Sequence, residues 1–238
     1  MSEKSSGKGG KSASRPAAII STLIGVVVIV VVVLQQLGVI DLEVGESTPD
    51  ANPSPGASAT DVDQARAWLD ELRVEEENDP DGYDRGLFPH WDRGVEGNCT
   101  TRQMVLVRDG EGVETDDDCR PVSGSWYSVF DGETFTDPQD IDIDHLVPLK
   151  EGWRSGAHAW STEERRRFAN DLEESPQLWA VSASSNRSKG DADPGDWLPP
   201  LESFHCEYVT AWIEVKHVWD LSVDPAEEAA MREVLEGC

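Results

Sequence analysis

The chain has 238 residues and a formal net charge of −27 at pH 7. This length suits one domain with additional segments rather than several domains. Residues 1–40 hold four cations and one carboxylate, a net +3, so the remaining residues carry −30. Such acidity excludes a protein that binds nucleic acid through an overall basic surface, because phosphates attract cations.

The N-terminal quarter of the chain is organised around one apolar segment. Residues 1–16 are rich in Ser, Gly and Lys and are predicted to form a disordered cytoplasmic tail. Residues 17–37 are predicted to form a transmembrane helix or signal anchor, because their Ile/Val-rich run is long enough to span a bilayer. The preceding cations place the N-terminus inside. Cleavage as a signal peptide is the alternative.

The rest of the chain is therefore expected outside the cell. Residues 38–60 are rich in Pro, Ser and Gly and predict a flexible stalk that precedes a domain at 61–238. Four cysteines follow the apolar segment, and an even number in an exported domain predicts two disulfides. Three pairings are possible; sequence proximity favours Cys99–Cys119 and Cys206–Cys238. A zinc site is the alternative, but no CxxC spacing supports it.

The first half of the domain contains one helical and several short apolar patterns. Residues 61–77 have helical spacing of apolar residues, with Asp61 or Asp63 as the N-cap. Residues 104–107 predict a short strand, and residues 109–118 an acidic loop. Two short segments, 125–130 and 133–136, flank Asp131-Gly132 and predict a β-hairpin.

The second half alternates strands and helices. Ser161 and Glu164 form the sequence pattern of a capping box, and Asp224 is a predicted N-cap. The predicted strands cover 141–146 and 178–181, and the predicted helices cover 162–172, 184–189, 203–219 and 225–235. The mixture predicts an α+β domain.

One constellation carries chemistry. Asp144 and His145 end an apolar-alternating run, and about forty residues later come Asn186, Arg187 and Lys189. A carboxylate and an amide oxygen can hold a divalent metal ion, an imidazole can activate water, and cations can bind phosphate.

These motifs resemble those of the HNH, or ββα-metal, nuclease superfamily. Within it, the chain resembles secreted actinobacterial HNH-family proteins related to the C-terminal domain of GmrSD-type restriction endonucleases. The likeness covers residues 80–238, with its core motif at 140–200, and includes YDRGLFPHW, CTTRQMVL and WLPP. It implies an α+β fold with a ββα-metal (HNH/His-Me finger) core, added helices and a second β-hairpin, here preceded by the predicted transmembrane helix.

The resemblance also implies roles for individual residues. His145 would be the general base, and Asp144 and Asn186 the metal ligands. The middle position of the motif is assigned to Asn170, with Gln177 as the alternative. The oxygen donors favour Mg²⁺, with Mn²⁺ as a possible substitute. A long insertion between His145 and Asn186 leaves the register of the hairpin open.

Other charged residues have two interpretations. Arg187, Lys189 and Arg167 are expected to contact substrate phosphate. Arg187 and Lys189 can equally be solvated charges, and residues 165–167 more often form a solvated helix face with at most one arginine pointing at the site. Asp142 and Asp140 are expected to have a supporting or surface role. Arg102 is either a structural arginine or a phosphate clamp. The remaining histidines are expected to be structural.

The function predicted from these residues is that of an exported, membrane-tethered, metal-dependent endonuclease. Its substrate would be nucleic acid, DNA rather than RNA, and no protein partner can be inferred. The predicted location is the cell membrane with the C-terminal domain outside, or the medium after signal cleavage. The alternatives are a catalytically inactive extracellular binding module that retains the HNH fold, and a hydrolase of another phosphoester.

Overall fold

The computed structural model describes residues 60–77 and 79–238. The predicted cytoplasmic tail, the segment at 17–37 and the stalk up to residue 59 lie outside the described residues. Among the helices within the described part of the chain, none has the length and apolar character needed to cross a bilayer.

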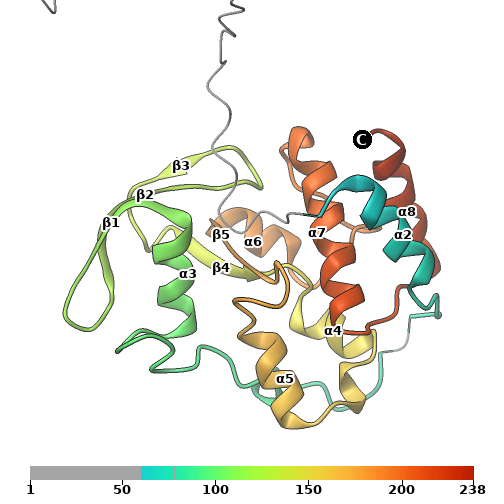
Figure 1. Ribbon diagram of the computed structural model, residues 1–238, viewed down its shortest axis with the longest axis horizontal. Helices are drawn as coiled ribbons and strands as arrows, with labels where there is room; N and C mark the ends of the chain where they lie inside the picture. Colours follow the sequence, from blue (N-terminus) through green and yellow to red (C-terminus); the bar gives the residue numbers. More distant parts are fainter. Residues whose placement is uncertain (1–59, 78) are drawn as a thin grey trace, which may run out of the picture. The chain divides into compact units, whose positions relative to one another are not determined.

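Three helices pack side by side at one end of the domain: α2 (Val62–Glu71), α7 (His205–Val218) and α8 (Pro225–Glu236) (Figure 1). The Asp61 carboxylate caps α2, and Asp224 forms a capping box with Glu227 at α8. Most of α7 is buried, including Tyr208 and Trp212. The predicted helices in these regions are therefore confirmed, with α2 ending earlier than expected.

A small sheet with one helix lies at the other end. The helix α3 (Thr101–Asp109) is followed by β1 (Gly110–Thr115), β2 (Pro121–Tyr127) and β3 (Thr134–Phe135), which form an antiparallel sheet in that order (Figure 1). The turn between β2 and β3 contains Gly132 at φ 76, a conformation that favours glycine. The predicted hairpin at Asp131-Gly132 is confirmed.

Two expectations in this region are wrong. Residues 104–107, predicted as a strand, lie inside α3, because Thr100 and Gln103 form a capping box that starts a helix three residues earlier. Val105 and Leu106 are then buried on one helix face. The acidic stretch 109–118, predicted as a loop, supplies β1.

The centre of the domain is a two-stranded antiparallel hairpin followed by a short helix. Strands β4 (Ile141–His145) and β5 (Leu178–Ser182) pair with Ile141 opposite Ser182 and His145 opposite Leu178. Helix α6 (Ala183–Lys189) follows β5 directly. This is the predicted ββα arrangement, and the pairing settles its register.

The insertion between the two strands is helical. It contains α4 (Leu149–Arg154), which the sequence did not predict, and α5 (Thr162–Ala169), which begins at the predicted capping box of Ser161 and Glu164. Helix α5 ends at Ala169, before the predicted end at residue 172. Three 3₁₀ turns complete the described elements: η1 (Arg85–Leu87), η2 (Ala157–Ala159) and η3 (Glu202–Phe204).

The two faces of the β4–β5 hairpin have different environments. Ile141 and Ile143 share a cluster with Val105, Leu106 and Trp126. Because side chains alternate along a strand, Asp142 and Asp144 point to the other face, where α6 packs. The hairpin thus brings two carboxylates to the helix that carries Asn186.

Side chains of α3 occupy the outer edges of this hairpin. The Arg102 guanidinium donates to the carbonyl oxygen of Ile141 at 3.0 Å, which favours the structural interpretation of this arginine. On the other strand, the backbone N–H of Ala180 donates to the Asp109 carboxylate at 2.9 Å, and Arg108 donates to the Leu178 carbonyl.

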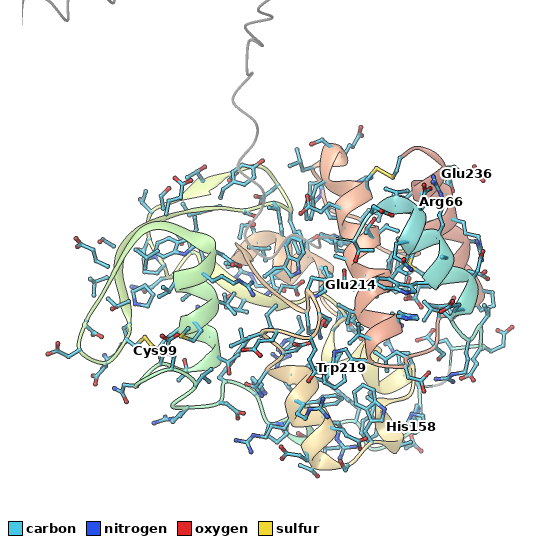
Figure 2. The ribbon with its side chains drawn as sticks, viewed as in Figure 1. Arg66, Cys99, His158, Glu214, Trp219 and Glu236 are labelled. Atoms are coloured by element: carbon cyan, nitrogen blue, oxygen red, sulfur yellow. A yellow bond between two sulfur atoms is a disulfide. The ribbon has the colours of Figure 1, made fainter. Side chains whose placement is uncertain are left out.

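Both disulfides have the pairing that sequence proximity favoured. Cys99–Cys119 joins the start of α3 to the loop before β2, with 5.2 Å between the Cα atoms. Cys206–Cys238 joins α7 to the end of the chain, at 5.8 Å. Both distances are ordinary for disulfides. Figure 2 shows the two bridges at separate places on the domain.

Candidate active site

His145 is the last residue of β4 and is only 4% exposed. Its Nε2 lies 3.0 Å from the carbonyl oxygen of Ala169, at the end of α5. A carbonyl only accepts, so Nε2 must carry the proton, and Nδ1 of the neutral ring keeps its lone pair. Burial lowers the pKa of His145 to about 3, with the charge of Arg85 acting in the same direction. The ring is therefore an unprotonated base at neutral pH.

Asn170 follows the carbonyl that holds His145. Its Nδ2 donates to the carbonyl oxygens of Pro89 at 2.9 Å and Arg166 at 2.7 Å. Its Oδ1 accepts from the Asp92 N–H at 2.9 Å and the Thr101 hydroxyl at 2.8 Å. The side chain thus braces the segment that precedes α3 against the end of α5.

Gln177, the alternative for the middle position, has a different place. Its side-chain amide pairs with both backbone groups of Val147, at 3.0 and 2.9 Å. It therefore fixes the chain as it leaves β4, and its side-chain amide is engaged by Val147 rather than by the segment that Asn170 braces.

Asp144 and Lys189 form a buried pair between β4 and α6. Lys189 Nζ lies 2.6 Å from Asp144 Oδ2 and donates to the carbonyl oxygen of His145 at 2.9 Å. Burial raises the pKa of the Asp144 carboxyl, and the adjacent ammonium acts in the opposite direction. Lys189 is 2% exposed, so the structure does not place it where a substrate phosphate reaches it.

Asn186 lies one turn before Lys189 and faces a different carboxylate. Its Nδ2 is 3.4 Å from Asp142 Oδ2, and both side chains are half-buried. Asp142, expected to have a supporting or surface role, is thus the carboxylate in contact with Asn186, while Asp144 sits deeper on the same face.

The helix that carries Asn186 is fixed at its start by the β2–β3 turn. Asp131 accepts hydrogen bonds from the hydroxyl groups of Ser182, the N-cap of α6, and Ser185. Partial burial alone would raise the pKa of Asp131, but these hydrogen bonds lower it below its usual value. The turn therefore holds a carboxylate that sets the position of α6.

The other two predicted phosphate contacts differ from each other. Arg187 on α6 is exposed. Arg167 on α5 forms a bidentate pair with Glu174, at 2.8 and 3.0 Å, and lies over the Trp219 ring. The structure does not bring Arg167 to Asp144, His145 or Asn186.

The donors around β4 and α6 have the chemistry that a hard divalent cation requires. Within residues 60–77 and 79–238, no three His, Cys, Asp or Glu side chains are grouped as a metal site. Asn186 carries an amide oxygen as a further donor, although the atom of this side chain that faces the Asp142 carboxylate is Nδ2. A site with only a few protein oxygens suits Mg²⁺, which keeps several of its waters.

Residues 115–234 match the family described as GmrSD restriction endonucleases, C-terminal domain. The chain belongs to this family. A GmrSD C-terminal domain thus comprises β2 to β5, α4 to α7 and nearly all of α8, and it includes every predicted metal and base residue.

A relative extends the similarity beyond the GmrSD C-terminal domain. An "Uncharacterized secreted protein" of the fungus Arthroderma benhamiae is 46% identical over 192 residues, which is 81% of this chain and 93% of the relative. No solved structure matches the chain.

Several features of the site have no local signal in the sequence. The Ala169 carbonyl is backbone and invisible to motif analysis. Trp91, whose ring centroid lies 5.3 Å from that of His145, is 54 positions away from it in the sequence. Two signals were available: the alternation that puts Asp142 beside Asp144, and the three-residue spacing that puts Asn186 and Lys189 on one helix face.

Proposed function

We propose that the domain is an exported, metal-dependent endonuclease that hydrolyses phosphodiester bonds of nucleic acid, with DNA as the preferred substrate. The observation that carries the proposal is the state of His145. Its ring is neutral, its Nε2–H is fixed on the Ala169 carbonyl, and its Nδ1 is left as a base. Membership of a restriction endonuclease family supports the same chemistry.

In this proposal, His145 Nδ1 takes the proton from the attacking water. A pKa near 3 makes a weak base, but a phosphodiester bound beside the ring adds negative charge, which favours the protonated form and raises the pKa. Asn170 has a positioning role, because it braces the end of α5 where His145 is hydrogen-bonded.

The Asp142 carboxylate, the Asn186 amide oxygen and the second oxygen of Asp144 would hold the divalent cation, Mg²⁺ by preference and Mn²⁺ as a substitute. A cation there would neutralise charge on the phosphate and the leaving oxygen. The buried Lys189 ammonium fixes the orientation of the Asp144 carboxylate and neutralises its charge from the interior of the domain. Arg187, exposed on the same helix, is the proposed phosphate contact of α6.

The domain is proposed to act outside the cell. Two disulfides persist only in an oxidising environment, and the fungal relative is described as secreted. In this proposal, residues 17–37 anchor the protein in the membrane, and residues 38–60 are the stalk. Full-length protein in the membrane fraction, with its C-terminus accessible to protease from outside, is the expected result. A shortened form found only in the medium would replace the anchor by a cleaved signal.

One observation favours a second candidate, a binding module that retains the fold without catalysis. The Lys189 ammonium occupies one oxygen of Asp144, a proposed metal ligand, at 2.6 Å. The net charge of −27 also opposes broad attraction of nucleic acid.

The test of the proposed function is incubation of purified residues 61–238 with supercoiled plasmid and with RNA, in Mg²⁺ and in EDTA. Nicking that requires Mg²⁺ and is lost in His145→Ala supports the nuclease. Intact plasmid and RNA in Mg²⁺ and Mn²⁺, from protein with both disulfides formed, would leave the binding module as the explanation.

A further inference from the structure

A segment outside the matched family region forms one wall of the proposed site. Residues 84–92, which we call the strap, run past His145 before α3 begins. They are held by one hydrogen bond within the strap and by side chains of α5 and its C-cap residue Asn170. The Gly86 N–H donates to the Asp84 carboxylate at 2.6 Å, and Arg165 donates to the Leu87 carbonyl at 3.0 Å. The Asn170 side chain donates to the Pro89 carbonyl and accepts from the Asp92 N–H, and Arg166 donates to the Asp92 carboxylate at 2.9 Å.

The strap places an aromatic ring on the imidazole of His145. The rings of Trp91 and His145 stack, with centroids 5.3 Å apart and an interplanar angle of 27°. Trp91 has φ 61, a conformation that is uncommon for a bulky residue and persists only where the surroundings enforce it. The backbone is thus held in an unfavourable conformation at the residue that contacts the proposed base.

The strap also carries a cation beside the site. Arg85 is exposed, and its guanidinium makes no ion pair with another residue in the described part of the chain. Arg85 begins η1, the turn of the strap whose Leu87 carbonyl accepts from Arg165 at 3.0 Å, and its charge acts together with burial to lower the pKa of His145. Arg166, on the neighbouring helix α5, differs from Arg85 because its guanidinium pairs with Asp92 of the strap.

We propose that the strap is the substrate-binding wall of the site, in which Arg85 binds a phosphate of the nucleic-acid backbone and Trp91 is a positioning residue that fixes the His145 ring. The inference rests on the proposed function for the identity of the ligand. It explains how a chain with a net charge of −27 holds a polyanion, because a local cation beside the reacting groups acts where the overall field is repulsive.

The Arg85 part is tested by binding without cleavage. A short fluorescein-labelled DNA duplex is titrated in EDTA with wild type, Arg85→Ala, Arg85→Lys and the control Arg232→Ala. Arg232 is a partly exposed arginine on α8 that pairs with Asp70 and Glu228. We expect Arg85→Ala to weaken binding about tenfold and to reduce the salt dependence by about one phosphate contact, with Arg85→Lys intermediate. Equal affinities of Arg85→Ala and Arg232→Ala for the duplex would overturn the phosphate-binding role of Arg85. The absence of duplex binding by wild type would also overturn it.

The Trp91 part is tested by the tautomer of His145. Trp91→Gly removes the ring and relieves the positive φ, and Asp220→Gly, at φ 50, relieves a similar backbone conformation elsewhere. We expect ¹⁵N NMR to show one fixed His145 tautomer, protonated at Nε2, in wild type and Asp220→Gly, and a mixture in Trp91→Gly. Trp91→Phe should restore the single tautomer. A single tautomer in Trp91→Gly overturns the positioning role.

Cleavage separates this inference from the proposed function. We expect Trp91→Gly to lower kcat about a hundredfold with little change in KM, since misplacement of a reacting group acts on the chemical step. If wild type binds the duplex through Arg85 but never cleaves it, the nuclease proposal is wrong, whereas the proposal that the strap binds nucleic acid still holds. If wild type cleaves and neither Arg85→Ala nor Trp91→Gly differs from its control, the role proposed for the strap is wrong and the nuclease proposal still holds.

Discussion

Lys189 Nζ lies 2.6 Å from Asp144 Oδ2, and the two side chains are 0% and 4% exposed. A lysine predicted to contact substrate is instead the internal counterion of a predicted metal ligand. The pair ties the first strand of the hairpin to the helix that ends the ββα unit. It therefore sets how far Asp142 and Asn186 stand from each other.

Removing the lysine should destabilise the domain strongly. Lys189→Met leaves the Asp144 carboxylate buried without its partner, which costs about 3–5 kcal/mol in the free energy of unfolding. Lys150→Met is the control, because Lys150 pairs with Asp191 at a more exposed site and should cost less than about 1 kcal/mol. Urea denaturation measures both, and adding Asp144→Asn to Lys189→Met should recover part of the loss. Equal midpoints for the two lysine variants would contradict the prediction.

His145→Ala should abolish cleavage and also weaken the fold. The loss of a general base lowers the rate about 10²–10⁴-fold. The ring is buried and hydrogen-bonded to the Ala169 carbonyl, so its removal should also cost roughly 1–3 kcal/mol in the free energy of unfolding. The matched control is His158→Ala, since His158 Nδ1 also contacts a carbonyl, that of Trp153, at 3.0 Å but at an exposed position. Plasmid nicking and thermal melting of both variants separate the two effects.

Asp142→Ala and Asn186→Ala should each weaken Mg²⁺ binding, because each removes an oxygen from the half-buried pair. Asp140→Ala removes a nearby exposed carboxylate and should leave the Mg²⁺ affinity at the wild-type value. Calorimetric titration with Mg²⁺ compares the three. If all three variants bind Mg²⁺ like wild type, the cation is held elsewhere.

The stability of the helical end should fall as the pH rises from about 5 to 7. Burial raises the pKa of Glu227 to about 7, with the Lys216 ammonium opposing and Glu151 adding to the rise. The folded state therefore binds this proton more tightly than the unfolded state, where the pKa is 4.5. The stabilisation is complete below the unfolded pKa and is lost as the pH passes the folded one.

A difference of one pKa unit corresponds to about 1.4 kcal/mol, so the free energy of unfolding should lose on the order of a few kcal/mol as Glu227 deprotonates. Glu227→Gln should flatten the pH dependence of the free energy of unfolding between pH 5 and 7. Glu228→Gln, next to it and paired with Arg232, should keep the wild-type slope. Identical slopes for Glu227→Gln and wild type would show that other groups are responsible.

Replacing Cys206 and Cys238 by serine should lower stability by roughly 2–4 kcal/mol, because the bridge closes a loop of 32 residues that the unfolded chain would otherwise explore. The same replacement at Cys99 and Cys119 acts on a loop of 20 residues and should cost slightly less. Denaturation of the two double variants under non-reducing conditions shows which of them loses more stability. Four free thiols by mass spectrometry of exported protein would rule out both bridges.

Local signals predicted most of the fold. The caps at Asp61, Ser161 and Asp224 are patterns of a few neighbouring residues, and the structure confirms all three. The error at 104–107 has a physical reason: a four-residue apolar run fits a strand and a buried helix face equally well. Only the capping residues before it distinguish the two.

The sequence could predict which residues belong to the candidate site, but not which groups they contact. Asp144, His145 and Asn186 follow from motif spacing. The partner of Asp144 is 45 positions away in the sequence, and the partner of His145 is a backbone carbonyl. Such contacts depend on how the long insertion packs, and no local pattern encodes that packing.

The side chains of α3 along both outer edges of the β4–β5 hairpin have a consequence for the protein in solution. Unpaired N–H and C=O groups at a strand edge can recruit a strand from another molecule. Arg102 and Asp109 already occupy such groups at Ile141 and Ala180. The α3 side chains thus occupy edge groups on both strands of a two-stranded unit that could otherwise pair with a strand of another molecule, which disfavours self-association through β4 and β5.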